Sequence, residues 1–257
     1  MATKKRLVKR LVNTPYQAFY GYGYYPGFYF DPTYILIIIG ALISMWASAR
    51  VKSTFAKYDR MQNLRGMTGA QAAEMILHSA GIYDVSIQRV SGSLTDHYDP
   101  SSKILRLSDS VFGRTSVAAI GVAAHECGHA IQHDQGYAPL QIRTSLVPIC
   151  NFGSTISWPL ILLGVILGWN QTLIRIGIIL FCAVVLFQLV TLPVEFNASS
   201  RALKMLSSMG ILHGEENDAA KKVLSAAALT YVAGAAASIL QLLRLILLFG
   251  GRGRRDD

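Results

Sequence analysis

Two histidines and a glutamate stand within five consecutive residues, His125-Glu126-Cys127-Gly128-His129. The alanine- and valine-rich stretch around them lacks proline, which predicts a buried helix. Histidines four positions apart share one helical face, so both imidazoles can reach one zinc ion at about 2.0–2.1 Å. Zinc polarises a carbonyl and lowers the pKa of bound water toward about 7. The spacing predicts that His125 and His129 bind zinc and that Glu126 is the general base of a hydrolytic reaction.

A catalytic zinc of this kind takes three protein ligands and leaves one position open for water. Glu195 ends an apolar run in LVTLPVEFNASSRAL, where a lone carboxylate is costly to bury unless it is paired or bound to a metal. Glu215 and Glu216 instead resemble a solvated helix start. His133 lies one turn beyond the motif, but rotation along one helix makes a third ligand there awkward. We therefore predict Glu195 as the third ligand. Two core histidines without a metal are the alternative.

Apolar stretches around this motif are long enough to cross a bilayer, which takes roughly 20 residues. The chain is 52% hydrophobic and 15% charged, which is unusual for a soluble protein. We expect a first transmembrane helix at 32–49 and a helical hairpin at 146–194. The stretch 229–249 is a further transmembrane or interfacial helix, because Gln241 and Arg244 interrupt it. The sequence thus predicts three or four membrane spans.

The polar region 50–145 between the first span and the hairpin is predicted to contain helices and a small sheet. Thr68 and Gln71 form a capping box for a helix that ends before Gly81. Residues 85–90 and 104–107 alternate as strands do. The expected fold class is α+β, with a zincin-like catalytic domain on a helical membrane anchor. The remaining segments are a basic, aromatic N-terminus (1–31), a third-ligand helix with its extension (195–228) and a basic tail (250–257).

The formal net charge of +9 does not indicate nucleic-acid binding, because the basic residues flank the apolar runs. The expected partners are the lipid bilayer and protein or peptide substrates. The three cysteines do not suggest a disulfide framework. The first span and the hairpin place His125 and Glu195 on the same side of a cell membrane. Ten lysines and arginines lie near span ends on that side, so the positive-inside rule predicts a cytoplasmic catalytic region.

Four segments of the chain resemble the YugP-like membrane zinc metallopeptidases of bacteria. They are FDPTYILIIIGALISMWASARVKSTF, SGSLTDHYDPSSKILRLSDSVF, VAAHECGHAIQH and LPVEFNASSRAL. The resemblance implies a gluzincin-type peptidase, distantly similar to HtpX-like heat-shock proteases and CAAX prenyl proteases, with Glu195 at the third-ligand position. Those relatives usually carry an aspartate four residues after the ligand glutamate. Here Ser199 stands at that position, so no carboxylate is available there to orient a zinc-binding histidine.

Other polar residues carry weaker hypotheses. Residues 96–99 form either a strand edge that holds an extended peptide or a plain turn. Tyr98 and Arg201 are candidates for stabilising the oxyanion of a reacting carbonyl. The sequence predicts a zinc-dependent membrane endopeptidase. The alternatives are a metal-binding scaffold or degenerate peptidase without hydrolytic activity, and a transporter-like helical membrane protein.

Overall fold

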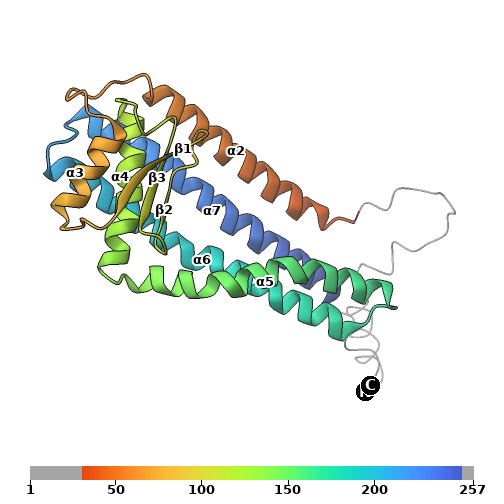
Figure 1. Ribbon diagram of the computed structural model, residues 1–257. Helices are drawn as coiled ribbons and strands as arrows, with labels where there is room; N and C mark the ends of the chain where they lie inside the picture. Colours follow the sequence, from red (N-terminus) through yellow and green to blue (C-terminus); the bar gives the residue numbers. More distant parts are fainter. Residues whose placement is uncertain (1–30, 251–257) are drawn as a thin grey trace, which may run out of the picture. The chain divides into compact units, whose positions relative to one another are not determined.

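The computed structural model describes residues 31–250, and in this range it contains six helices and three strands. They are α2 (Tyr34–Tyr58), α3 (Gly69–Ser79), β1 (Ser86–Val90), β2 (His97–Asp99), β3 (Ile104–Ser108), α4 (Val117–Asp134), α5 (Ala138–Ile166), α6 (Gln171–Ser208) and α7 (Glu215–Phe249). The described chain is therefore mostly helical, with the expected sheet as a small addition. Figure 1 shows α3, α4 and the sheet gathered at one end of the long helices. The predicted N-terminal segment and basic tail lie outside the described residues, apart from residues 31 and 250.

Helix α3 begins and ends where the sequence predicts. The Thr68 side chain accepts a hydrogen bond from the backbone N–H of Gln71, and the Gln71 side chain accepts one from the backbone N–H of Thr68. Gly81 follows the helix with a φ of 78°, a left-handed conformation that costs glycine little. The predicted capping box is confirmed.

The sheet has the strand order β1-β3-β2. β1 runs parallel to β3, whereas β2 pairs with β3 in the antiparallel direction. The strands predicted at 85–90 and 104–107 correspond to β1 and β3. β2 was left open between a strand edge and a turn, because three residues show too little alternation to predict a strand. The structure makes β2 an edge strand, and it lies against α4.

Four helices are long and apolar enough to cross a membrane, by length and composition: α2, α5, α6 and α7. The sequence predicted three or four spans, and α7 is a fourth candidate by the same criterion. In α7, the buried Arg244 places its guanidinium carbon 4.3 Å from the centroid of the Tyr34 ring on α2. Helices α5 and α6 pack closely where their residues are small. At Gly177 there is no room for a side chain, since an added Cβ would lie 2.9 Å from the Ser157 carbonyl oxygen.

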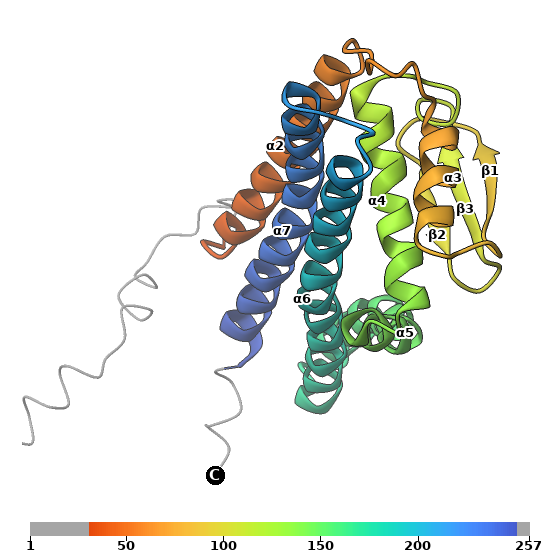
Figure 2. The same cartoon turned by 90° about the vertical axis from the view of Figure 1, so that its left-hand side faces the viewer.

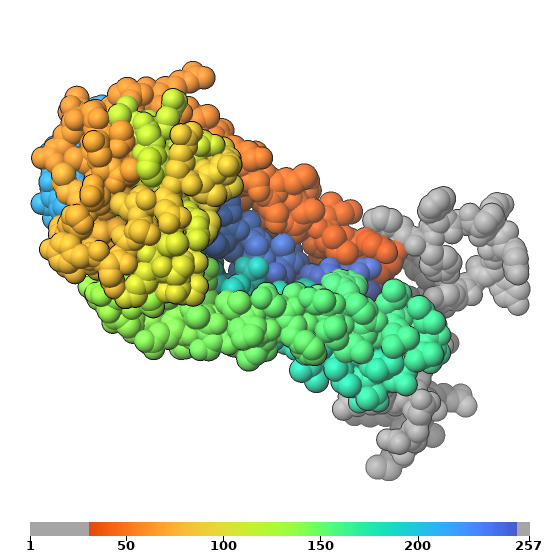
Figure 3. All heavy atoms as spheres, viewed as in Figure 1, coloured from red at the N-terminus to blue at the C-terminus, as the bar shows by residue number. Residues whose placement is uncertain are grey.

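Helix α4 lies between two layers, with α3 and the sheet on one side and α6 and α7 on the other (Figure 2). Thirteen of its eighteen residues are buried, so any polar side chain on it needs a partner within the protein. Its N-cap is Ser116, whose side chain accepts from the backbone N–H of Ala119. The space-filling view shows a hollow between α2 and α5, with α6 and α7 at its floor (Figure 3).

Candidate metal centre

The histidines of the motif lie on one face of α4, as their spacing predicts. The ring centroids of His125 and His129 are 4.8 Å apart, and the rings meet edge to face. Their Nε2 atoms both point toward one carboxylate, that of Glu195 on α6. This arrangement joins residues seventy positions apart in the chain.

The three side chains converge at the spacing of ligands around a single zinc ion. Glu195 Oε2 lies 3.3 Å from His125 Nε2 and 3.5 Å from His129 Nε2. Two ligand atoms about 2.0–2.1 Å from one ion at the tetrahedral angle are about 3.3–3.4 Å apart. Only 2% of the Glu195 side chain is exposed, so its charge needs a positive partner. Two imidazoles and one carboxylate at this spacing fit zinc.

Gly128 lets α6 approach α4 closely enough to complete this cluster. A Cβ at this position would lie 2.5 Å from the backbone oxygen of Ala198, a contact that a protein does not tolerate without movement. Ala198 stands between Glu195 and Ser199 on α6. The glycine within the motif therefore allows the two helices to pack closely, a role that its position in the sequence does not indicate.

Each histidine has a hydrogen-bond partner on the ring nitrogen that faces away from the cluster. Ser199 Oγ lies 3.1 Å from His125 Nδ1, and Gln132 Oε1 lies 3.0 Å from His129 Nδ1. When Nδ1 donates to these oxygens, Nε2 keeps its lone pair for a metal. Ser199 therefore contacts the ring that an aspartate was expected to orient, and a hydroxyl replaces the carboxylate. Gln132 was not predicted from the sequence as a partner of His129. Its position one helical turn after His129 is the feature of the sequence that indicates this contact.

A chain of hydrogen bonds fixes Gln132 in place. Its Nε2 donates to the Val194 backbone oxygen at 2.8 Å and to Asn197 Oδ1 at 3.0 Å. Arg201 Nε donates to the same Asn197 oxygen at 2.7 Å, and Arg201 Nη1 donates to Gln135 Oε1 at 2.5 Å. Arg201, a predicted oxyanion candidate, is thus part of the support for His129 and does not contact the cluster.

Glu126 is buried, with 8% of its surface exposed, and precedes the second histidine on the same helix. Burial by itself lowers the pKa of His129. The hydrogen bond to Glu195 and the charges of Glu126 and Glu195 outweigh that effect, so the pKa of His129 is raised. Two carboxylates around a buried imidazole make this a place that favours a cation.

The other predicted residues lie away from the cluster. His133 is exposed and forms a hydrogen bond of 2.9 Å with the Tyr98 hydroxyl. Burial raises the pKa of Tyr98 to about 12, with further contributions from Asp84, Asp99 and Asp134, so the phenol stays protonated. Tyr98 therefore links β2 to α4.

Among the glutamates at the start of α7, Glu215 is exposed as expected, but Glu216 is not. Glu216 is only 4% exposed and accepts hydrogen bonds from the backbone N–H groups of Leu64 and His213. The interpretation of Glu216 as a solvated residue is wrong. It was missed because its partner Leu64 lies 152 positions away in the chain.

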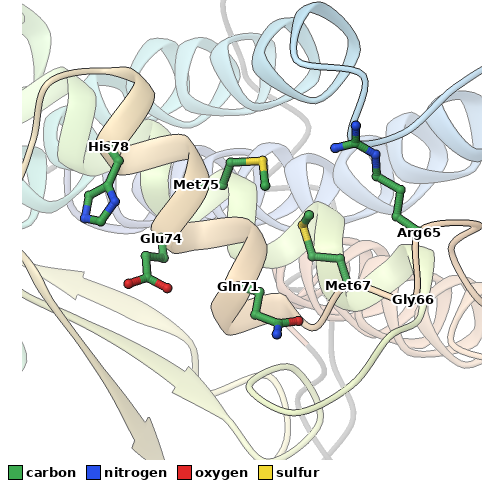
Figure 4. Close-up of a pocket in the computed structure, with 7 residues that line it drawn as sticks. All are labelled: Arg65, Gly66, Met67, Gln71, Glu74, Met75 and His78. Atoms are coloured by element: carbon green, nitrogen blue, oxygen red, sulfur yellow. The ribbon is translucent and has the colours of Figure 1, made fainter.

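A surface pocket on α3 is separate from this centre (Figure 4). It is lined by Arg65, Gly66, Met67, Gln71, Glu74, Met75 and His78. None of these residues belongs to the His/His/Glu cluster. Within residues 31–250, the candidate metal centre is therefore the His/His/Glu cluster between α4 and α6.

Four helices are long and apolar enough to cross a membrane, and a His/His/Glu cluster, with Glu195 buried and both histidines partly buried, has the donor set found in zinc peptidases. Residues 33–250 match the model of the family described as "Putative neutral zinc metallopeptidase", and the chain belongs to this family. The chain is also similar to "Putative membrane protease YugP" of Bacillus subtilis (strain 168). The two are 49% identical over 217 residues, which cover 84% of this chain and 96% of the relative. No solved structure shows significant similarity to it. The resemblance stated from the sequence is confirmed.

Proposed function

We propose that this protein is a membrane zinc endopeptidase of the gluzincin type, with a zincin-like catalytic region. His125, His129 and Glu195 would hold the zinc ion. The observation that carries the proposal is the convergence of two Nε2 atoms on one Glu195 oxygen at 3.3 and 3.5 Å. Glu126 follows His125 directly on the same helix. The family membership supports both the metal and the class of reaction.

The proposed reaction is hydrolysis of a peptide bond by water. When bound, zinc supplies Lewis acidity, which polarises the scissile carbonyl and makes water acidic enough to attack near neutral pH. Glu126 accepts the proton from the attacking water and then delivers it to the leaving amine nitrogen. Ser199 and Gln132 hold the two imidazoles in one tautomer and orientation while this happens.

Edge strand β2 is the proposed support for an extended substrate. In the strand order β1-β3-β2, β2 is the last strand, so it has a neighbouring strand on one side only. The hydrogen bond between Tyr98 and His133 joins β2 to α4, the helix of the motif. A peptide could add to this edge through main-chain hydrogen bonds, which do not depend on side-chain identity. The expected substrates are therefore unfolded or loosely folded segments of membrane or misfolded proteins.

Replacing Glu126 with Gln tests the chemistry. The variant should keep stoichiometric zinc, because the three ligands remain, yet lose at least about a hundredfold in peptidase activity. The measurement is zinc content of the purified full chain beside cleavage of a labelled unfolded protein such as casein. Glu74→Gln, an exposed change on α3, is the matched control. Native activity in Glu126→Gln would refute the mechanism, and absence of activity in the native protein would favour a metal-binding scaffold.

We also propose that the catalytic region faces the cytoplasm, on the basis of the positive-inside rule. A cysteine introduced at the exposed Ser101, beside β2, tests this in intact cells with an impermeant thiol reagent. A cysteine at Gln171, the first residue of α6 at the turn of the hairpin, is the control for the opposite side. Gln171→Cys should react, and Ser101→Cys should react only after the membrane is opened. The reverse pattern would contradict the proposed orientation.

A further inference from the structure

An arginine from the membrane hairpin contacts the third member of the cluster. Arg143, in the second turn of α5, places Nη1 3.3 Å from Glu195 Oε1. The Arg143 side chain is 30% exposed, whereas that of Glu195 is 2% exposed. An ion pair with one partner so deeply buried is screened less by water than a surface pair.

The two oxygens of Glu195 have different partners. Oε2 faces the Nε2 atoms of the two histidines, and Oε1 faces the guanidinium of Arg143. A carboxylate free at both oxygens can bind a metal through one of them or both. A carboxylate whose Oε1 is held by an arginine has only Oε2 to offer.

We propose that Arg143 is a positioning residue that holds Glu195 Oε1, so that Glu195 binds the metal through Oε2 alone. This inference rests on the proposed zinc site. Its consequence is a ligand set of three atoms, which leaves the fourth tetrahedral position for the attacking water.

The geometry distinguishes Arg143 from the other arginine near the cluster. Arg201 is engaged by Asn197 and Gln135, and it acts on His129 only through Gln132. Arg143 contacts a predicted ligand directly, and it comes from α5, which follows α4 after a short turn. The membrane hairpin would thereby contribute a side chain to the metal centre.

Cobalt substitution tests this role through a readout that does not depend on activity. The visible d–d absorption of a Co²⁺ protein is stronger for four-coordinate than for five-coordinate metal. In Arg143→Gln, release of Oε1 should let Glu195 bind through both oxygens, which weakens this absorption. Zinc affinity should fall by about 10- to 100-fold, as is typical when a partner of a metal ligand is removed.

Two further variants complete the experiment on the full chain in detergent. Arg143→Lys keeps the charge and should recover most of the native absorption. If Arg143→Gln does not fold, Arg143→Met takes its place with the same expected result. Arg89→Gln removes an exposed ion pair with Asp109 on the sheet and should leave the spectrum and affinity unchanged. Native spectra and affinity in both Arg143 variants would overturn the inference alone. Failure of the native protein to bind Co²⁺ or Zn²⁺ would overturn the proposed function with it.

Discussion

The two halves of α6 are packed in opposite ways. In the N-terminal half, large apolar side chains such as Ile179 and Leu186 are exposed, and contact with α5 is made at Gly177. In the C-terminal half, Ala198 and Ala202 are fully buried against α4. Polar side chains lie inside the protein in this half, and Glu195 is the most deeply buried of them.

This difference shows how one helix can serve two environments. Where lipid is the solvent, apolar side chains gain nothing from burial, so association depends on close contact of small residues. In the half beside α4, polar groups removed from water need hydrogen-bond partners within the protein. Glu195 and Ser199 both find such a partner in His125, a residue of the candidate metal centre. Substitutions beside α4 should therefore affect zinc binding more than substitutions in the N-terminal half of α6.

The largest effect is expected from Glu195→Ala. Loss of a ligand should lower zinc affinity by more than about a hundredfold, beyond what the loss of a supporting hydrogen bond does, and should abolish activity. Zinc content and competition with a chelator measure it. Glu215→Ala, at an exposed position on α7, should change neither quantity. Zinc retained by Glu195→Ala with native affinity would show that this half of α6 does not contribute a ligand.

Gly128→Ala should have the next largest effect, because the added Cβ would meet the Ala198 backbone oxygen at 2.5 Å. Separation of α4 and α6 should cost about 1–3 kcal/mol of stability and reduce zinc binding. Gly121→Ala on the same helix is the control, since its Cβ would lie at an ordinary 3.4 Å from the nearest atom, Ala220 Cβ. Thermal unfolding in detergent, with and without zinc, compares the two. Equal melting temperatures and zinc content would mean that the close approach is unimportant.

Gln132→Met should be milder, because it keeps the side-chain volume and all three predicted ligands, although it removes the hydrogen bonds to His129, Val194 and Asn197. We expect zinc affinity to fall by about 10- to 100-fold with a smaller change in folding stability. Isothermal titration with zinc measures the affinity. If affinity is unchanged while the protein is less stable, Gln132 serves packing of α4 on α6 and does not orient the imidazole.

The smallest effect is expected in the N-terminal half of α6. Ser157→Ala removes the hydrogen bond of 2.9 Å from Ser157 Oγ to the Gly177 backbone oxygen. Hydrogen bonds between membrane helices contribute about 0.6 kcal/mol on average, so the melting temperature should fall slightly. Zinc affinity should stay native. A loss of zinc in this variant would show that the two halves of α6 are coupled.

Local signals in the sequence were sufficient for several elements. The capping box at Thr68 and the glycine after α3 act within a few residues, and the apolar runs fall within single helices. The histidine spacing is also local, because one turn of α4 brings the two rings together. The burial of Glu216 was missed, because its partner Leu64 lies 152 positions away in the chain. Strand β2 stayed undecided between a strand edge and a turn, because three residues show too little alternation.

The sequence by itself determined the membrane character, the motif helix and the residue types of the metal cluster, because these follow from composition and from spacing along one helix. Tertiary structure alone decided which atoms meet. The approach of α6 to α4 at Gly128, the partners of the two Nδ1 atoms, and the division of the Glu195 oxygens between histidines and Arg143 all join distant segments. Such contacts depend on how helices pack, and helix packing is set by the summed fit of many side chains, which no short stretch of sequence contains.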